Sequence, residues 1–263
     1  MNIRLFRISM FLFLLAGCAT SPLGRKQLIL VPQVQIDEMG SQAFQKMKDS
    51  QPIDTDPQLR SYIQCIVDPL TARSGGTAAG KNWEVVVFKG DQANAFALPG
   101  GKIGVYTGIL QVAKTPSQLA TVIGHEIGHV IAQHGAERVS QEMGTQLSLA
   151  MIRSMSSKSA NSDRLMSLLG LGAQIGILLP FSRAQESEAD LIGLDLMARA
   201  GFDPHASVEL WQNMIHAAGG KGPPSWLSTH PASETRIKQL QAHMTEAELK
   251  SNQAKGLAPV CHR

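Results

Sequence analysis

Apolar residues recur every three or four positions over several stretches of the chain, the spacing that gathers them on one face of a helix. The clearest of these helices begins at Asp56 and Pro57, residue types that favour an N-cap and a first helical turn. Its apolar positions are Leu59, Ile63, Ile66, Val67 and Leu70. Further helices are predicted over residues 34–49, after residues 202–204 (FDP) and from about 233 to 250.

A short run of extended structure interrupts these helices. Residues 83–88 (WEVVVF) are rich in β-branched and aromatic side chains, which favour a strand. Residues 94–98 (NAFAL) and 102–108 (KIGVYTG) flank Gly100 and Gly101, a pair typical of a turn between two extended segments. The expected fold class is therefore α+β, a mainly helical domain with a small β-sheet that precedes a histidine-bearing helix.

That helix carries the most specific chemistry in the chain. Residues 122–135 read VIGHEIGHVIAQHG. At 100° per residue, His125 and His129 lie about 40° apart, beside the apolar face of the helix. Two imidazoles one turn apart bind zinc, and Glu126 between them lies within reach of a water molecule at the metal. The pattern predicts half of a zinc site; the alternative is a pair of surface histidines.

The third histidine of this stretch occupies a different part of the helix. The helix is predicted to begin with Thr115 as N-cap and Gln118 completing a capping box. On a continuous helix His134 falls about 180° from His125, inside the apolar face. This position favours a buried, hydrogen-bonded histidine over a metal ligand. A metzincin site is also excluded, because its third histidine would stand at Gly135.

A third protein ligand is needed, since catalytic zinc takes three and a water. Residues 182–190 read SRAQESEAD, in which Glu186 and Asp190 are four apart and share a helix face. Glu186 can bind zinc while Asp190 accepts a hydrogen bond from an imidazole N–H and fixes its tautomer. Glu188 is a rival ligand that lies about 200° around the helix from Glu186. Without the histidine pair, the stretch would equally fit an acidic surface.

Composition and charge narrow the classes of function. Charged residues make up 17% and aromatic residues 5% of the 263 residues, which is typical of a globular protein and not of a disordered one. The formal net charge is +3, and two of these charges, Arg4 and Arg7, lie at the extreme N-terminus. This near-neutral balance gives no basis for nucleic-acid binding, so none is expected.

The N-terminus indicates secretion and a lipid anchor. A basic start precedes an apolar run over residues 8–16, which is shorter than the ~20 residues of a membrane-spanning helix and fits a secretory signal. The run ends in LAGC, which resembles a bacterial lipobox with Cys18 as the lipidated residue. Ala19, in place of aspartate, favours the periplasmic side of the outer membrane by the same resemblance. The alternative is a plain signal peptide with a chance cysteine.

Three regions follow from these features. Residues 1–17 are expected to be a lipoprotein signal peptide, residues 18–33 a lipidated tether, and residues 34–263 the metallopeptidase domain. Within that domain, residues 165–181 carry no charge and are interpreted as a buried helix, with membrane contact as the alternative. Cys65 and Cys261 can pair in an oxidising periplasm or remain two free thiols, since the sequence gives no distance between them.

Several motifs together resemble one peptidase family. The matching stretches are HEIGH (125–129), ESEAD (186–190), NAFALPGG (94–101), FDP (202–204) and STHP (228–231). They are similar to those of the gluzincin family that includes the prenyl-protein CAAX endopeptidase, the heat-shock protease HtpX and periplasmic lipoprotein peptidases of the BepA and LoiP kind. The chain lacks the long helical repeat array of BepA, so it is more similar to single-domain lipoproteins of the LoiP kind.

The resemblance implies a zincin fold and a complete set of site residues. It implies one Zn²⁺ per subunit, bound by His125, His129 and Glu186. It also implies that Glu126 is the catalytic base and that Asp190 lies behind a metal ligand.

Two further residues receive roles by the same resemblance. His230 in the THP loop is implied as an extra ligand that displaces water and gates activity, the alternative being a surface histidine. Arg236 is implied, more weakly, as a group that stabilises the oxyanion.

The substrate is expected to lie along residues 94–98. Asn94, Ala95 and Phe96 would pair with the backbone of an extended peptide, a mode that reads backbone more than side chains. The alternative for this segment is a purely structural hairpin.

The expected function is a zinc endopeptidase of the bacterial envelope that cleaves unfolded or misassembled envelope proteins. The competing hypothesis is a periplasmic chaperone or scaffold whose zinc site is latent or rarely catalytic. An intact Glu126 favours the enzyme, because a structural zinc site needs no base.

Overall fold

The computed structural model describes residues 18–155, 181–218, 224–254, 256 and 259–263. The expected signal peptide (residues 1–17) lies outside the described residues, as does the apolar stretch 165–181 except for its last residue. Among the described residues, no helix has both the length and the apolar character that crossing a membrane requires.

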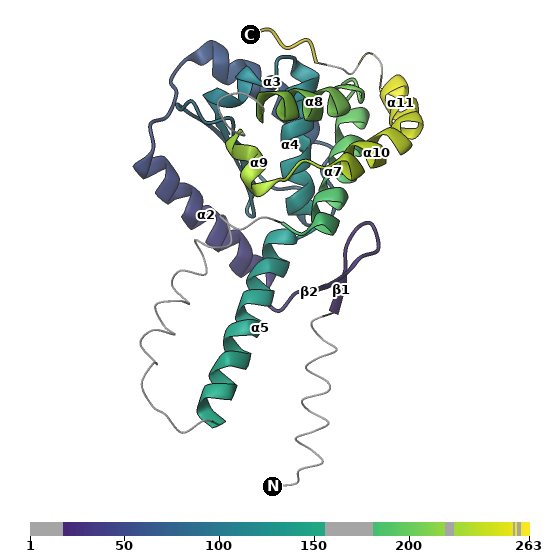
Figure 1. The fold of residues 1–263 in the computed structure, drawn as a ribbon. Coiled ribbons are helices and arrows are strands. Elements are labelled where there is room, and N and C mark those ends of the chain that lie inside the picture. The colour runs from purple at the N-terminus through teal and green to yellow at the C-terminus, as the bar shows by residue number, and fades with distance from the viewer. Residues whose placement is uncertain (1–17, 156–180, 219–223, 255, 257–258) are drawn as a thin grey trace.

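Helices form most of the described chain, as the α+β prediction requires (Figure 1). They are α2 (Gln33–Ser50), α3 (Pro57–Thr71), α4 (Pro116–Ile131), α5 (His134–Met155), α7 (Arg183–Arg199), α8 (Ala206–Ala218), α9 (Ser225–Thr229), α10 (Glu234–Ala242) and α11 (Met244–Gln253). In Figure 1, α4 runs through the middle of the helical body, while α5 projects away from it. The predicted helices over residues 34–49 and after Asp56 are confirmed.

A three-stranded sheet lies between α3 and α4 in the sequence, as predicted. Its strands are β3 (Glu84–Phe88), β4 (Ala95–Leu98) and β5 (Lys102–Tyr106), in the order β3-β5-β4. β5 runs parallel to β3 and antiparallel to β4. The predicted turn is confirmed, because Gly100 and Gly101 have φ values of 84° and 74°, which side chains rarely adopt. β4 is therefore an edge strand of this sheet.

Helix α4 occupies the centre of the fold. All of its residues from Gln118 to Ile131 are buried, against α7, α3, α8 and β4. Thr115 caps the helix by accepting a hydrogen bond from the Gln118 N–H, as predicted. The capping box is only half formed, because the Gln118 side chain accepts from the backbone N–H of Lys114 instead of from that of Thr115.

Glycines allow α4 and α7 to approach until their backbones touch. A Cβ added at Gly128 would lie 2.7 Å from the carbonyl oxygen of Ala189, and one at Gly193 would lie 2.7 Å from the amide nitrogen of His125. Real Cβ atoms do not come this close to backbone, so both positions require glycine. The close crossing sets the acidic stretch of α7 directly beside the histidines of α4.

We expect Gly193→Ala to separate these helices and to lower the free energy of unfolding by about 1–3 kcal/mol, the range for overpacking a tight contact. Urea unfolding measures the effect. Gly144→Ala in α5 is the matched control, because a Cβ there would meet no described atom within 4 Å. Equal midpoints for the two variants would contradict the close crossing.

The N-terminal segment differs from the expected tether. Residues Cys18–Thr20 (β1) and Lys26–Leu28 (β2) form an antiparallel hairpin. Arg25 at its turn contacts Glu137 of α5 at 2.8 Å and Glu188 of α7 at 2.9 Å. A lipidated tether was expected across residues 18–33, whereas residues 18–28 form this hairpin, which contacts two helices. These contacts join residues more than 100 positions apart, and a local pattern carries no sign of them.

The C-terminal helices also differ from their predicted bounds. The helix expected from about 233 to 250 is two helices, α10 and α11, which meet at His243. The helix expected directly after residues 202–204 begins later, at Ala206, because Asp203 caps a preceding turn by accepting the N–H of His205. Both differences lie at element ends, where local signals fix boundaries least well.

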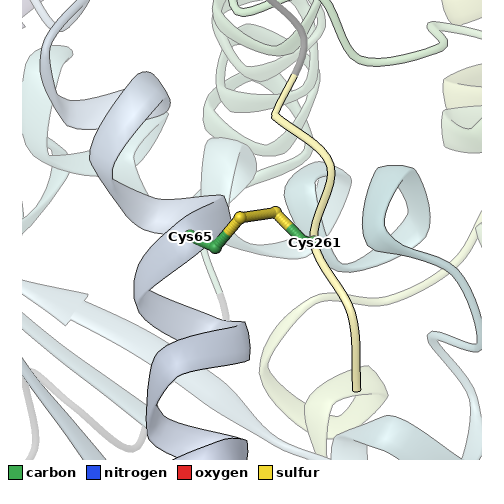
Figure 2. Close-up of a disulfide and its surroundings, with 2 residues drawn as sticks. All are labelled: Cys65 and Cys261. Atoms are coloured by element: carbon green, nitrogen blue, oxygen red, sulfur yellow. A yellow bond between two sulfur atoms is a disulfide. The ribbon is translucent and has the colours of Figure 1, made fainter.

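A disulfide joins α3 to the C-terminal segment, which resolves the open alternative for the two cysteines in favour of pairing. Cys65 and Cys261 are bonded, with their Cα atoms 5.8 Å apart, although 196 positions separate them in the sequence (Figure 2). The link encloses most of the described domain in one covalent loop.

The double variant Cys65→Ala/Cys261→Ala is expected to lose about 2–5 kcal/mol of unfolding free energy, because removal of a cross-link frees the unfolded chain. Urea unfolding of oxidised protein and of the variant checks this. Wild-type protein under a reductant should unfold at the midpoint of the variant. An unchanged midpoint in both cases would contradict a stabilising bond.

Candidate metal centre

Three segments bring four potential metal ligands together. His125 and His129 come from α4, Glu186 from the first turn of α7, and His230 from the residue that follows α9. All four are buried, and one ligand atom of each lies within 4.8 Å of the others. The structure therefore places Glu186 beside the histidine pair, as expected. It also places His230, which the resemblance implied as an extra ligand, inside this buried cluster and not on the surface.

The spacing of these atoms fits zinc. The Nε2 atoms of His125 and His129 lie 3.0 Å apart, and each lies 3.5 Å from a Glu186 oxygen. The Nδ1 atom of His230 lies 3.1 Å from His125 Nε2 and 3.0 Å from Glu186 Oε1. Ligands bound to tetrahedral zinc at about 2.0–2.2 Å lie about 3.3–3.6 Å apart, close to this spacing. Two imidazole nitrogens that face one another repel unless a proton or a cation lies between them.

The two histidines of α4 differ in their pKa values. Burial lowers the pKa of His125, but the hydrogen bonds that its ring donates to Asp190 and Glu186 outweigh burial and raise that pKa to about 9. Burial and the neighbouring histidines hold the pKa of His129 well below its usual value, so His129 is neutral. The metal-free cluster thus carries a proton that zinc has to displace, as is general for metal sites built from histidine.

Asp190 and Arg236 lie behind the ligands. Asp190 Oδ1 is 3.0 Å from His125 Nδ1, the position expected for a carboxylate that fixes the tautomer of a ligand. Arg236 is buried and pairs with both oxygens of Asp190, and its Nη1 lies 2.7 Å from Glu186 Oε2. The guanidinium is therefore engaged by two carboxylates of the site. These ion pairs place Arg236 behind the ligands, and its expected role toward an oxyanion stays a prediction.

Glu126 points toward the cluster without joining it. Its Oε1 accepts a hydrogen bond from the indole N–H of Trp226 at 2.7 Å and lies 3.4 Å from His230 Nε2. Trp226 is fully buried, and sequence reasoning missed it. A buried indole requires an acceptor, but spacing along the chain does not reveal which one. The arrangement holds a carboxylate beside the metal position, where it can accept a proton.

His134 is buried, and it lies outside the four-residue cluster, as expected. Its direction is not the predicted one, because α4 ends at Ile131 and α5 begins at His134 after Gln133 adopts a φ of 58°. The ring therefore turns back, and its Nδ1 lies 2.8 Å from Nδ1 of His129. The rival ligand Glu188 is also outside the cluster and contacts His134 Nε2 at 3.1 Å.

Comparison with known proteins identifies the family. Residues 57–244 match the model of peptidase family M48. The chain belongs to peptidase family M48. The matched region contains all four residues of the metal cluster, Glu126 and Asp190. Family membership and the fit of the donor set together make this a zinc-dependent metalloendopeptidase domain.

Relatives of this M48 domain occur in mitochondria and in bacteria. "Mitochondrial metalloendopeptidase OMA1" of Schizosaccharomyces pombe is 37% identical over 190 residues, which are 72% of this chain and 54% of that protein. The protein of the same name in Arabidopsis thaliana is 41% identical over 171 residues, 65% of this chain and 33% of that protein. "Beta-barrel assembly-enhancing protease" of Yersinia pestis is 30% identical over 210 residues, which are 77% of this chain and 42% of that protein. The chain thus spans between about a third and about half of the length of these relatives.

A cavity of about 550 Å³ opens beside the metal centre of the M48 domain. Side chains from α2, β4, α5 and α9 form mostly apolar walls, and Glu126, His129 and His230 are among the lining residues. Asn94, Ala95 and Phe96 lie along the β4 wall, where the substrate was expected. The cavity therefore joins the edge strand to the metal position.

The backbone of β4 is open on one side. Asn94 accepts a hydrogen bond from Tyr106 on β5, and bonded pairs alternate along an antiparallel ladder. Phe96 therefore also faces β5, while the backbone groups of Ala95 and Ala97 point to the other edge. No strand of the described chain pairs with that edge. Within the described residues, this unpaired edge lies in the wall of the cavity beside the metal centre.

Proposed function

We propose that this M48 domain cleaves unfolded or misassembled proteins of the bacterial envelope as a quality-control endopeptidase. The observation that carries the proposal is the open edge of β4, which runs along an apolar cavity to Glu126 and the metal cluster. An edge strand binds a peptide through its backbone, so it accepts many sequences, provided that they are extended. Folded proteins rarely offer such a segment. The name of the Yersinia pestis relative, which refers to β-barrel assembly, supports the envelope as the setting.

Each residue of the site has a separate role in peptide hydrolysis. His125, His129 and Glu186 would hold zinc, which would supply a positive charge that polarises the scissile carbonyl and lowers the pKa of a water molecule. Glu126 accepts the proton of the attacking water and returns it to the leaving amine. The indole of Trp226 holds that carboxylate in place. Backbone groups of Ala95 and Ala97 hold the peptide, and the cavity takes up its apolar side chains.

The test compares an unfolded outer-membrane protein with its folded form as substrates of the purified protein. We expect cleavage of the unfolded form, loss of cleavage with a chelator, and recovery with added zinc. Measured zinc content of one ion per chain accompanies the assay. The competing function, a chaperone or scaffold, predicts that the substrate is kept from aggregating but stays intact. Cleavage that survives complete zinc removal would contradict the proposal.

We also propose that His230 holds the site in a closed state. Structural zinc sites have four protein ligands, whereas catalytic sites keep one position open. His230 supplies a fourth donor, so a peptide and water have to displace it. His230→Ala should therefore change the cleavage rate, whereas His216→Ala, at an exposed histidine, should not. Equal rates in wild type and His230→Ala would rule the gate out.

A lipid anchor at Cys18 is proposed for the same protein. The support is the basic start, the short apolar run and LAGC before this residue, with Ala19 favouring the periplasmic face of the outer membrane. Cells grown with radiolabelled palmitate should label the wild type and not Cys18→Ser, and fractionation should place the labelled protein in outer membranes. Equal labelling of the two, or none, would contradict the anchor.

A further inference from the structure

A line of hydrogen bonds leads from the metal cluster to the N-terminal hairpin. His129 Nδ1 lies 2.8 Å from His134 Nδ1, and His134 Nε2 lies 3.1 Å from Glu188 Oε2. The same Glu188 oxygen accepts a hydrogen bond from Arg25 Nε at 2.9 Å. His129, His134 and Glu188 are all buried. His134 and Glu188 thus connect His129, a potential metal ligand, with Arg25 in the β1–β2 turn.

The hydrogen atoms along this line can be assigned from chemistry. If Nε2 of His129 binds the metal, its ring is neutral and Nδ1 carries the proton. His129 then donates to Nδ1 of His134, which places the proton of the second ring on Nε2. That nitrogen donates in turn to the Glu188 carboxylate. Every donor meets an acceptor in this order, and the negative end of the line makes His129 a stronger ligand.

The carboxylate end of the line is itself held by the hairpin. Arg25 bonds Glu188 with Nε and both oxygens of Glu137 with its two terminal nitrogens. The backbone N–H of Leu23 also approaches Glu188, at 3.4 Å. On the far side, Gln185 of α7 donates to Glu137 at 2.7 Å. The hairpin is therefore fastened where α5 and α7 meet.

We propose that His134, Glu188 and Arg25 are positioning residues that orient His129 for zinc, so that the docked hairpin completes the metal centre. None of the three supplies a ligand. The hairpin begins at Cys18, seven residues before Arg25. The segment beside the proposed anchor would thereby influence how tightly zinc binds, and displacement of the hairpin would weaken zinc binding.

Zinc affinity tests the proposal without reference to any substrate. In the purified protein, we expect His134→Phe and Glu188→Gln each to weaken zinc binding by about 10–100-fold, the usual effect of mutating residues that support a metal ligand. Arg25→Gln should weaken zinc binding in the same direction, and Arg25→Lys should recover part of it. Competition with a chromogenic chelator measures these affinities.

Two further readouts separate positioning from general stability. Imidazole ¹⁵N spectra of the zinc-loaded protein should show the His129 Nδ1 proton in the wild type and a shifted resonance in both variants. Where proteolysis is measurable, kcat should fall with KM nearly unchanged, because the peptide site is not touched. Arg199→Gln is the control, since Arg199 forms a partly exposed ion pair with Asp195 at the far end of α7.

The zinc affinities of the two variants decide whether these residues position His129. Zinc affinities of His134→Phe and Glu188→Gln within about twofold of the wild type, in folded protein, would overturn the proposal. If His134→Phe does not fold, Glu188→Gln alone decides, because glutamine keeps the shape of glutamate and removes the negative charge at the end of the line. The inference rests on zinc binding and not on the proposed substrates. A wild type that binds zinc but cleaves nothing would contradict the proposed function and leave this comparison intact.

Discussion

Replacement of Glu126 by glutamine is expected to slow peptide hydrolysis by roughly 10²- to 10⁴-fold, the contribution of a positioned general base. The amide has the shape of the carboxylate, and its oxygen can still accept the indole N–H of Trp226, which lies 2.7 Å from Glu126 Oε1. It cannot accept a proton from water. The change therefore removes the base and preserves the surroundings. Single-turnover cleavage of an unfolded substrate measures it.

The control for this variant is its zinc content, which should equal that of the wild type because Glu126 is not among the four clustered ligands. Glu84→Gln, at a salt-bridged surface residue of β3, should retain full activity. If Glu126→Gln cleaved as fast as the wild type while retaining zinc, another group would have to be the base.

The second large effect is expected for Arg236→Met, with a loss of about 3–5 kcal/mol of unfolding free energy, the range for removing one partner of a buried ion pair. Arg236 pairs with Asp190 at 2.6 Å and with Glu186 at 2.7 Å, and all three are buried. Burial alone would raise the pKa of Asp190, but Arg236 and His125 hold it below its usual value. Without the guanidinium, two buried carboxylates lose their cation.

The loss should be largest in the absence of metal, because bound zinc offsets part of the charge of Glu186. Urea unfolding with and without a chelator measures both states. Arg236→Lys should be intermediate, since an ammonium cannot bridge both carboxylates as a planar fork does. Arg199→Met at a partly exposed pair is the control and should change stability by less than about 1 kcal/mol. If Arg236→Met also changed the free energy of unfolding by less than about 1 kcal/mol, the buried ion pairs would contribute little to stability.

Features that depend on a few neighbouring residues could be predicted from the sequence. Asp56 and Thr115 cap the helices that follow them, and the two glycines after β4 make the expected turn. Three residues of the metal cluster could be predicted in the same way, since His125 and His129 are one turn apart and Glu186 shares a face with Asp190, whereas His230 was implied only by the family resemblance. The close crossing of α4 and α7 at their glycines then brings Glu186 beside the two histidines.

Features set by tertiary contacts could not be predicted. The angle assigned to His134 assumed a continuous helix, and the break at Gln133 turned that ring toward His129. Trp226 and Arg25 reach their partners across 100 and 163 positions, respectively, and neither residue type carries a local signal of such a contact. Long-range partners of this kind fix the surroundings of the ligands, whereas local patterns identify the ligands themselves.

The Cys65–Cys261 bond has a consequence for an enzyme that cuts polypeptides. His125, His129, Glu186 and His230 all lie between the two cysteines, so a self-inflicted nick within that interval leaves both fragments covalently joined until the bond is reduced. Such a molecule would migrate as intact protein on a non-reducing gel. A nick before Cys65, by contrast, would release the hairpin that carries Arg25. A cut between the two cysteines therefore leaves the chain in one covalent piece, whereas a cut before Cys65 divides it in two.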